Sequence, residues 1–312
     1  MTRSRHRSFQ TFITLAVSVA GSLAAPAVAQ PGATPAVAAQ PPEPARPFTT
    51  ADELLDALAT ADKGLASLTA RVRYVRNFGA IEGGEVQIRS GTLWFLAEPQ
   101  SSVVVTDPDK PAPAAPPSRK RFAIDFTTLQ IGSENRKEEK SYIFDGEWFI
   151  EKDAAQRQII KRRVVPAGEI ADPLRIGQGP FPIPIGQRKQ EILARFDVTL
   201  VDPLEGIPDA PSLRILLATT YQLKLVPKPN TDEANDFREV RIWYRTTDLL
   251  PRMARTIETD GSAAEVLLIE MKRNPLDHQG KSFVTLARFD GQTPEGWAEQ
   301  VDDLPKPSDT DK

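Results

Sequence analysis

Residues 141–150 read SYIFDGEWFI and contain two short apolar runs on either side of an Asp-Gly pair. The runs are Tyr142-Ile143-Phe144 and Trp148-Phe149-Ile150, and both are rich in the aromatic and β-branched residues that favour strands. Asp145-Gly146 has the composition that a type I′ turn prefers, because that turn needs positive φ at both central positions. The stretch therefore predicts a β-hairpin.

Apolar and polar side chains alternate on both sides of this hairpin, as expected for strands with one buried face. The alternation is clearest at residues 71–78, 121–126, 221–225 and 240–245. Asp260-Gly261 marks a second hairpin turn before another such run. Strands joined by short turns pair antiparallel, so the pattern predicts an antiparallel sheet of about ten strands with one face in water.

Two stretches have helical rather than strand periodicity. Thr50 followed three residues later by Glu53 is a capping-box pattern. The apolar residues after it recur every three to four positions and predict a helix over 54–68, while a shorter pattern predicts a second helix around Ile192. One side of the first helix carries Leu54, Leu55, Leu58, Ala61 and Leu65.

Together these elements predict a mainly β fold with α-helices (α+β). We expect an unclosed antiparallel half-barrel whose helices cover the concave face. The alternative is a closed barrel filled by side chains. A closed barrel would leave the leucines of the first helix no apolar surface to pack on, so the open form is favoured.

The N-terminal residues predict export. A basic start, an apolar stretch over 12–25 and the tripeptide Ala27-Val28-Ala29 form a signal-peptide pattern, so residues 1–29 are expected to be cleaved. Loss of the three arginines in this segment lowers the formal net charge from −3 to −6, which disfavours nucleic acid as a partner. We expect a soluble, monomeric protein of the periplasm.

Composition also sets the expected limits of the folded part. The 312 residues are 40% hydrophobic and 26% charged, which is ordinary for a globular protein. Residues 30–47 predict a disordered Pro/Ala linker and residues 305–312 a disordered tail. A single domain is expected over 48–304, with a Pro/Ala-rich surface insertion at 107–118.

The residues available for catalysis are few. Cysteine is absent and the two histidines are His6 and His278, so thiolate metal sites are excluded, and we expect neither metal nor cofactor. His278 has no Gly-x-Ser-x-Gly partner, and Gly83-Gly84 precedes a strand rather than a helix, so serine hydrolases and phosphate loops are not indicated. A hydrolase that works through carboxylates stays open as an alternative, but we do not expect an enzyme.

The order of these patterns resembles the LolA family of outer-membrane lipoprotein carriers. Residues 69–74 follow the leucine-rich helix, Ser90-Gly91-Thr92-Leu93-Trp94-Phe95 is similar to the family's Gly-x-Leu-Trp strand, and the hairpin at 144–149 is similar to its Asp-Gly hairpin. Residues 122–126, Leu249-Leu250-Pro251 and a closing strand over 289–297 also fall in the family's order. The resemblance covers about residues 50–300, and Glu98 stands before Pro99 where the family carries a basic residue.

The resemblance implies a half-barrel that holds acyl chains between its sheet and its helices. It implies a carrier that takes lipoproteins, or other lipids, from an inner-membrane transporter to an outer-membrane acceptor. The alternative is a half-barrel module that senses lipoproteins or binds a regulatory protein. The tryptophans are core residues or ligand contacts, depending on the faces they share. The candidate lipid contacts are Leu54, Leu55, Leu58, Trp94, Phe122, Phe126, Trp148, Phe149, Leu223 and Ile242.

Overall fold

The computed structural model describes residues 47–79, 84–98, 119–166, 181, 183, 185 and 188–304. The expected signal peptide (1–29), the linker up to residue 46, the insertion at 107–118 and the tail at 305–312 lie outside the described residues. The described part is mostly β, with a few short helices.

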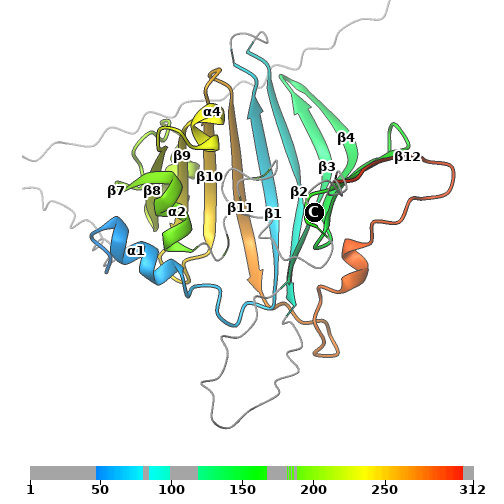
Figure 1. The fold of residues 1–312 in the computed structure, drawn as a ribbon, viewed down its shortest axis with the longest axis horizontal. Helices are drawn as coiled ribbons and strands as arrows, with labels where there is room; N and C mark the ends of the chain where they lie inside the picture. The colour runs from blue at the N-terminus through cyan, green and yellow to red at the C-terminus, as the bar shows by residue number, and fades with distance from the viewer. Residues whose placement is uncertain are drawn as a thin grey trace, which may run out of the picture. The chain divides into compact units, whose positions relative to one another are not determined.

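Within the described residues, twelve strands form one sheet in the order β12-β6-β5-β4-β3-β2-β1-β11-β10-β9-β8-β7 (Figure 1). The end strands β12 and β7 do not pair with each other, so the sheet is not closed and the closed-barrel alternative is wrong. The strands are β1 (Ser67–Asn77), β2 (Val86–Glu98), β3 (Arg119–Ile131), β4 (Glu134–Phe144), β5 (Trp148–Asp153), β6 (Gln158–Arg163), β7 (Phe196–Val201), β8 (Thr220–Pro227), β9 (Phe237–Arg245), β10 (Pro251–Glu258), β11 (Ala263–Arg273) and β12 (Ala298–Asp302).

Both predicted helices are present. α1 and α2 contact each other and β7, at one end of the sheet (Figure 1). Three further helical segments were not predicted, and each is short. The helices are α1 (Ala51–Leu58), α2 (Lys189–Arg195), α3 (Pro211–Ala218), α4 (Asp232–Asp236) and the 3₁₀-helix η1 (Leu286–Phe289).

Helix α1 starts as expected and ends earlier than expected. Thr50 and Glu53 form the predicted capping box. The prediction that the helix reaches residue 68 is wrong, because the N–H groups of Ala61, Lys63 and Leu65 donate three residues back rather than four. Gly64 then takes a positive φ of 71°, which ends the helical path before β1.

Cross-strand pairs separate the two faces of the sheet. Ala254 on β10 lies opposite Val266 on β11, while Met253 lies opposite Leu267, so these pairs point to opposite faces. The buried leucines of α1 pack in one cluster with Ala254, and we call this side the α1 face. The cluster around Val266 continues the α1 face across β1, β2, β3 and β4.

The opposite face, which carries Trp243 and Met253, is also covered. Residues of the loop before α3 and of α3 itself pack on Trp243 and Met253. Val284 and Phe289, from the segment after β11, pack on Ile143, Ile150 and other residues of β3 to β6. The expectation that one face of the sheet lies in water is therefore wrong at both places, because segments distant in sequence fold back over it.

Two turn and strand predictions are also corrected. The 141–150 hairpin forms, but only Gly146 has positive φ, so its turn is not type I′. The Asp145 side chain accepts hydrogen bonds from the N–H groups of Glu147 and Trp148 and holds the turn. The closing strand expected over 289–297 is absent; β12 starts at Ala298 and pairs parallel with β6, against the antiparallel expectation.

Candidate functional site

Five of the candidate lipid contacts lie in one cluster on the α1 face. The side chains of the α1 leucines are at most 4% exposed, and they pack with residues of α2, β8 and β9. Tyr221 and Tyr244 complete the cluster beside Ile192 of α2. The candidates in it are Leu54, Leu55, Leu58, Leu223 and Ile242.

Three further candidates lie on the same face, in the neighbouring cluster. Phe122 and Phe126 are buried, and Phe149 packs against them from β5. Phe122 stacks near Phe144, with ring centroids 6.2 Å apart. The α1 face is therefore apolar on both sides of the central pair β1–β11, so eight of the ten candidates share one surface.

Trp94 and Trp148 are placed on the opposite face, away from the other eight. Trp94 lies opposite Ala123 in the β2–β3 pair, and both pack in the cluster with Trp148. The Nε1 of Trp94 donates to Asp125 at 3.1 Å, and the Arg288 guanidinium lies 4.2 Å from the centre of its ring. The contact with Arg288 joins Trp94 to the segment that covers this face.

A cavity of about 250 Å³ opens at the edge of the α1 face. It lies where Tyr74 of β1 faces Arg89 of β2 and Arg76 faces Gln87. Its remaining lining comes from Phe78, Phe126, Tyr142 and Phe181. Rings and guanidinium groups meet there, whereas the clusters beside it are purely apolar at their centres.

A second cavity, of about 280 Å³, lies on the opposite face beside Trp94. Phe283 packs on Trp94 with ring centroids 5.8 Å apart and is nevertheless 53% exposed. Leu276, which also lines the cavity, and the nearby Leu286 are 65% and 54% exposed. Exposed apolar side chains therefore lie here next to the charged residues Arg71, Glu270 and Lys272.

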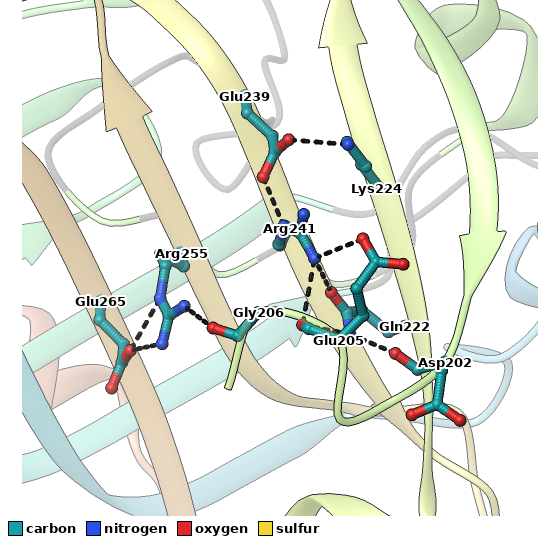
Figure 2. Close-up of polar contacts among 9 residues, drawn as sticks. All are labelled: Asp202, Glu205, Gly206, Gln222, Lys224, Glu239, Arg241, Arg255 and Glu265. Carbon is teal, nitrogen blue, oxygen red and sulfur yellow. Dashed lines mark hydrogen bonds and ion pairs between the residues drawn. The ribbon is translucent and has the colours of Figure 1, made fainter. Parts of the chain in front are cut away.

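Figure 2 shows a network of charged residues between the sheet and the loop over 202–209. The Arg241 Nη1 lies 2.9 Å from the Gln222 Oε1, and 3.1 Å from both a carboxylate oxygen and the carbonyl oxygen of Glu205. Glu239 accepts from the Arg241 Nε and lies 3.2 Å from Lys224. The Gln222 Nε2 donates to the Asp202 carbonyl oxygen at 2.6 Å.

This Arg241 network holds the loop over 202–209 against the sheet. Arg255 adds a second link, since it donates to the Gly206 carbonyl oxygen at 2.9 Å while paired with Glu265 at 2.7 Å (Figure 2). Strand alternation assigned Gln222 and Arg241 to water, and both are buried. The signal that could have revealed the cover is Trp243, a large apolar residue at a position of the water-facing series.

Glu98, which stands at the position where a basic residue was expected from the resemblance, also pairs within the sheet. Its Oε2 accepts from the Nη2 of Arg121 on β3 at 3.2 Å. Across the stretches that the structure describes, no group of three or more His, Asp or Glu side chains is placed to hold a metal ion. No helix there has the length and hydropathy to cross a membrane.

Comparisons with known proteins give similarity in structure only. No protein-family model matches the sequence, and no curated protein matches it. An uncharacterized conserved protein from Thermus thermophilus is 15% identical, with a TM-score of 0.39 over 80% of this chain and 98% of that one. The Pseudomonas aeruginosa MucA/MucB complex is 12% identical, with a TM-score of 0.34 over 74% of this chain and 60% of that one.

A LolA superfamily protein from Nitrosomonas europaea is 8% identical, with a TM-score of 0.28 over 74% of this chain and 97% of that one. LolA superfamily proteins are among the solved structures to which this chain is similar.

Proposed function

We propose that this protein binds the acyl chains of lipoproteins, or of other lipids, on its α1 face and carries them through the periplasm toward the outer membrane. The observation that supports the proposal is the extent of that face. One side of an open sheet is apolar from β4 to β8, and its edge opens into the cavity beside Tyr74. Acyl chains need such a surface, since each buried methylene contributes about 0.8 kcal/mol.

The proposal includes helices that cover the apolar face, of which α1 can undock from it. Helices α1 and α2 would cover the concave face of a half-barrel, with α1 giving way to acyl chains. α1 has eight residues, well below the roughly 12–15 residues that an isolated helix needs to persist in water. Its helical structure therefore depends on the docking of its leucines, and the loss of that docking would free an apolar surface on β8 and β9.

The delivery route is part of the same proposal. Residues 1–29 would direct export, an inner-membrane transporter would load the protein, and an outer-membrane acceptor would unload it. The role is binding rather than catalysis, which fits a sequence without cysteine and with only two histidines.

The proposal is tested by lipid that the protein retains. Mass spectrometry of organic extracts of the full chain, purified from the periplasm in which it was expressed, should find acyl chains in a stoichiometric amount. Phe149 and Trp148 give a matched pair of variants, because they are neighbours on β5 and belong to clusters on opposite faces. Phe149→Ala should lower the retained lipid and Trp148→Ala should not; an extract without acyl chains, or equal losses, would contradict the proposal.

A second candidate function is a sensing or protein-binding module. It is favoured by the exposed apolar side chains of Leu276 and Phe283, which line the 280 Å³ cavity, and of Leu286 at the start of η1, on the face that the acyl chains would not use. A sensor should form a stable complex with one periplasmic protein, and Phe283→Ser should abolish that complex while acyl retention stays unchanged.

A further inference from the structure

The cavity at the edge of the α1 face contains charge of one sign. Arg76 and Arg89 are the charged residues that line it. Their carboxylate partners, Glu258 and Glu138, are not among its lining residues. A ligand group in this cavity therefore meets guanidinium groups, while the compensating carboxylates lie outside its wall.

The two guanidinium groups differ in which of their nitrogen atoms already donate hydrogen bonds to a carboxylate. Glu258 accepts from both Nη1 and Nη2 of Arg76. Glu138 accepts from the Nε of Arg89, with both carboxylate oxygens within 3.2 Å. Among the described residues, Nη1 and Nη2 of Arg89 have no hydrogen-bond partner. Within the described part of the chain, Arg89 thus keeps the two terminal nitrogens that bind a carboxylate or a phosphate most specifically.

Apart from Gln87, the rest of the cavity wall is aromatic. The Phe181 ring lies 5.0 Å from the Tyr142 ring and 5.3 Å from the Tyr74 ring, both edge-to-face. Phe126 lies 5.9 Å from Phe181 and belongs to the apolar cluster that continues along the α1 face. The guanidinium groups therefore suit an anion, and the aromatic lining leads through Phe126 into a surface suited to a hydrocarbon chain.

The size of the cavity agrees with this division. About 250 Å³ is below the roughly 300–1,000 Å³ of sites that enclose a whole small molecule, so it fits a head group and the first part of a chain. Burial raises the pKa of Tyr74, and the positive charges of Arg76 and Arg89 act in the opposite direction. The charges of Tyr142 and Glu258 act in the same direction as burial.

We infer that this cavity binds the anionic head group, carboxylate or phosphate, of a single amphiphile, with Arg89 as the main donor and Arg76 as the second. The chain of the amphiphile runs from the aromatic wall onto the α1 face. This inference rests on the proposed function, because it takes the α1 face as the surface that holds the chain.

The test compares two ligands that differ only in their head group. Displacement of a neutral fluorescent probe from the full chain is measured with dodecanoate and with dodecan-1-ol at about pH 8, where the carboxylate is ionised. The parent protein should bind dodecanoate about tenfold more tightly, as expected for hydrogen bonds to a charged group. Arg89→Gln should reduce the affinity for dodecanoate to that for the alcohol and leave the alcohol unchanged.

Two further variants separate charge recognition from folding. Arg89→Lys keeps the positive charge without the paired donors and should retain part of the preference for dodecanoate. Arg71→Gln removes a guanidinium group that is 63% exposed and paired with Glu270 on the opposite side of β1, and it should change neither affinity. Equal melting temperatures of Arg89→Lys and the parent would show that the comparison is made between folded proteins.

Each outcome has a defined reading. Equal affinity of the parent for both ligands, or an equal loss of both in Arg89→Gln, overturns the head-group inference and leaves the proposed function standing. Failure of the parent to bind either ligand overturns the proposed function itself. A further measurement with inorganic phosphate alone distinguishes a lipid head group from a free anion as the ligand. Displacement of the probe by phosphate at the concentration of dodecanoate would indicate a free-anion site and overturn the inference.

Discussion

The Nε1 of Trp243, on β9, donates a hydrogen bond of 2.8 Å to the carbonyl oxygen of Pro203. This contact joins the loop over 202–209 to the sheet on the face opposite α1. The indole is fully buried, with Met253 and Leu217 in the same cluster. The relationship explains why the strand β9 carries large side chains on both of its faces.

Trp243→Ala should lower the free energy of unfolding by about 3–5 kcal/mol, since it removes the indole volume and the hydrogen bond together. Trp243→Phe keeps most of the volume and should cost less, about 1–3 kcal/mol for the unpaired carbonyl group of Pro203. Urea unfolding followed by circular dichroism measures both. An effect of Trp243→Ala below that of Trp243→Phe would contradict the packing described here.

Arg241→Met tests the network that fastens the same loop. The substitution leaves Gln222, whose side chain is fully buried, without the donor to its Oε1, and it should destabilise the protein by about 1–3 kcal/mol. Arg71→Met is the matched control, because the Arg71–Glu270 pair is 63% exposed on each side and should contribute between about 0 and 1 kcal/mol. Equal effects in chemical denaturation would show that the Arg241 network contributes no more than a surface pair.

Leu58→Ala tests whether α1 is a removable cover. The side chain is 4% exposed, so without ligand the substitution should cost about 2–5 kcal/mol. If acyl chains displace α1, the same substitution should cost much less in the presence of a saturating acyl ligand, because the leucine then leaves its packing site. Leu217→Ala, on the opposite face, should cost the same in both conditions. A ligand-independent cost for Leu58→Ala would mean that α1 stays docked.

Stability at low pH should depend on Glu258. Hydrogen bonds from Arg76, and to a lesser degree from Ser262, hold the pKa of Glu258 below its usual value, against an opposing effect of burial. A lowered pKa in the folded state means that the contribution is complete above the unfolded value of about 4.3 and is lost as the pH falls through the folded pKa. Glu258→Gln should therefore lose less stability than the parent between about pH 5 and pH 3. Glu270→Gln, whose carboxylate is 63% exposed, is the control and should follow the parent.

The face on which a side chain lies could be predicted wherever apolar and polar residues alternate along a single strand. Phe122 and Phe126 alternate with Asp125 and were assigned to one face, which the structure confirms. Trp94 could not be assigned in this way, because it stands between Leu93 and Phe95 in a continuous apolar run. Its face depends on the register with Ala123, which is a property of two strands and not of one.

Contacts between segments distant in sequence could not be predicted for a related reason, because local periodicity does not identify the partner of a segment. The Oδ1 of Asn274 accepts from the N–H groups of Ala66 and Ser67, over 208 and 207 residues, at the point where β1 begins. Nothing in residues 54–68 indicates that partner, so the helical pattern was extended past its real end. The cover over Gln222 and Arg241 was missed in the same way, since local alternation cannot show which loop returns over a strand.

The pairing of β1 with β11 has a consequence for the order of folding. β1 to β6 form neighbouring pairs along the chain, whereas the Arg71–Glu270 contact in the β1–β11 pair closes a separation of 199 residues. Closing a loop of that length costs chain entropy before its contacts can form, which slows folding. Until β11 has been synthesised and docked, β1 presents one open edge that another chain could pair with. The slowest and most aggregation-sensitive step of folding is therefore expected at the middle of the sheet, and not at either of its outer strands.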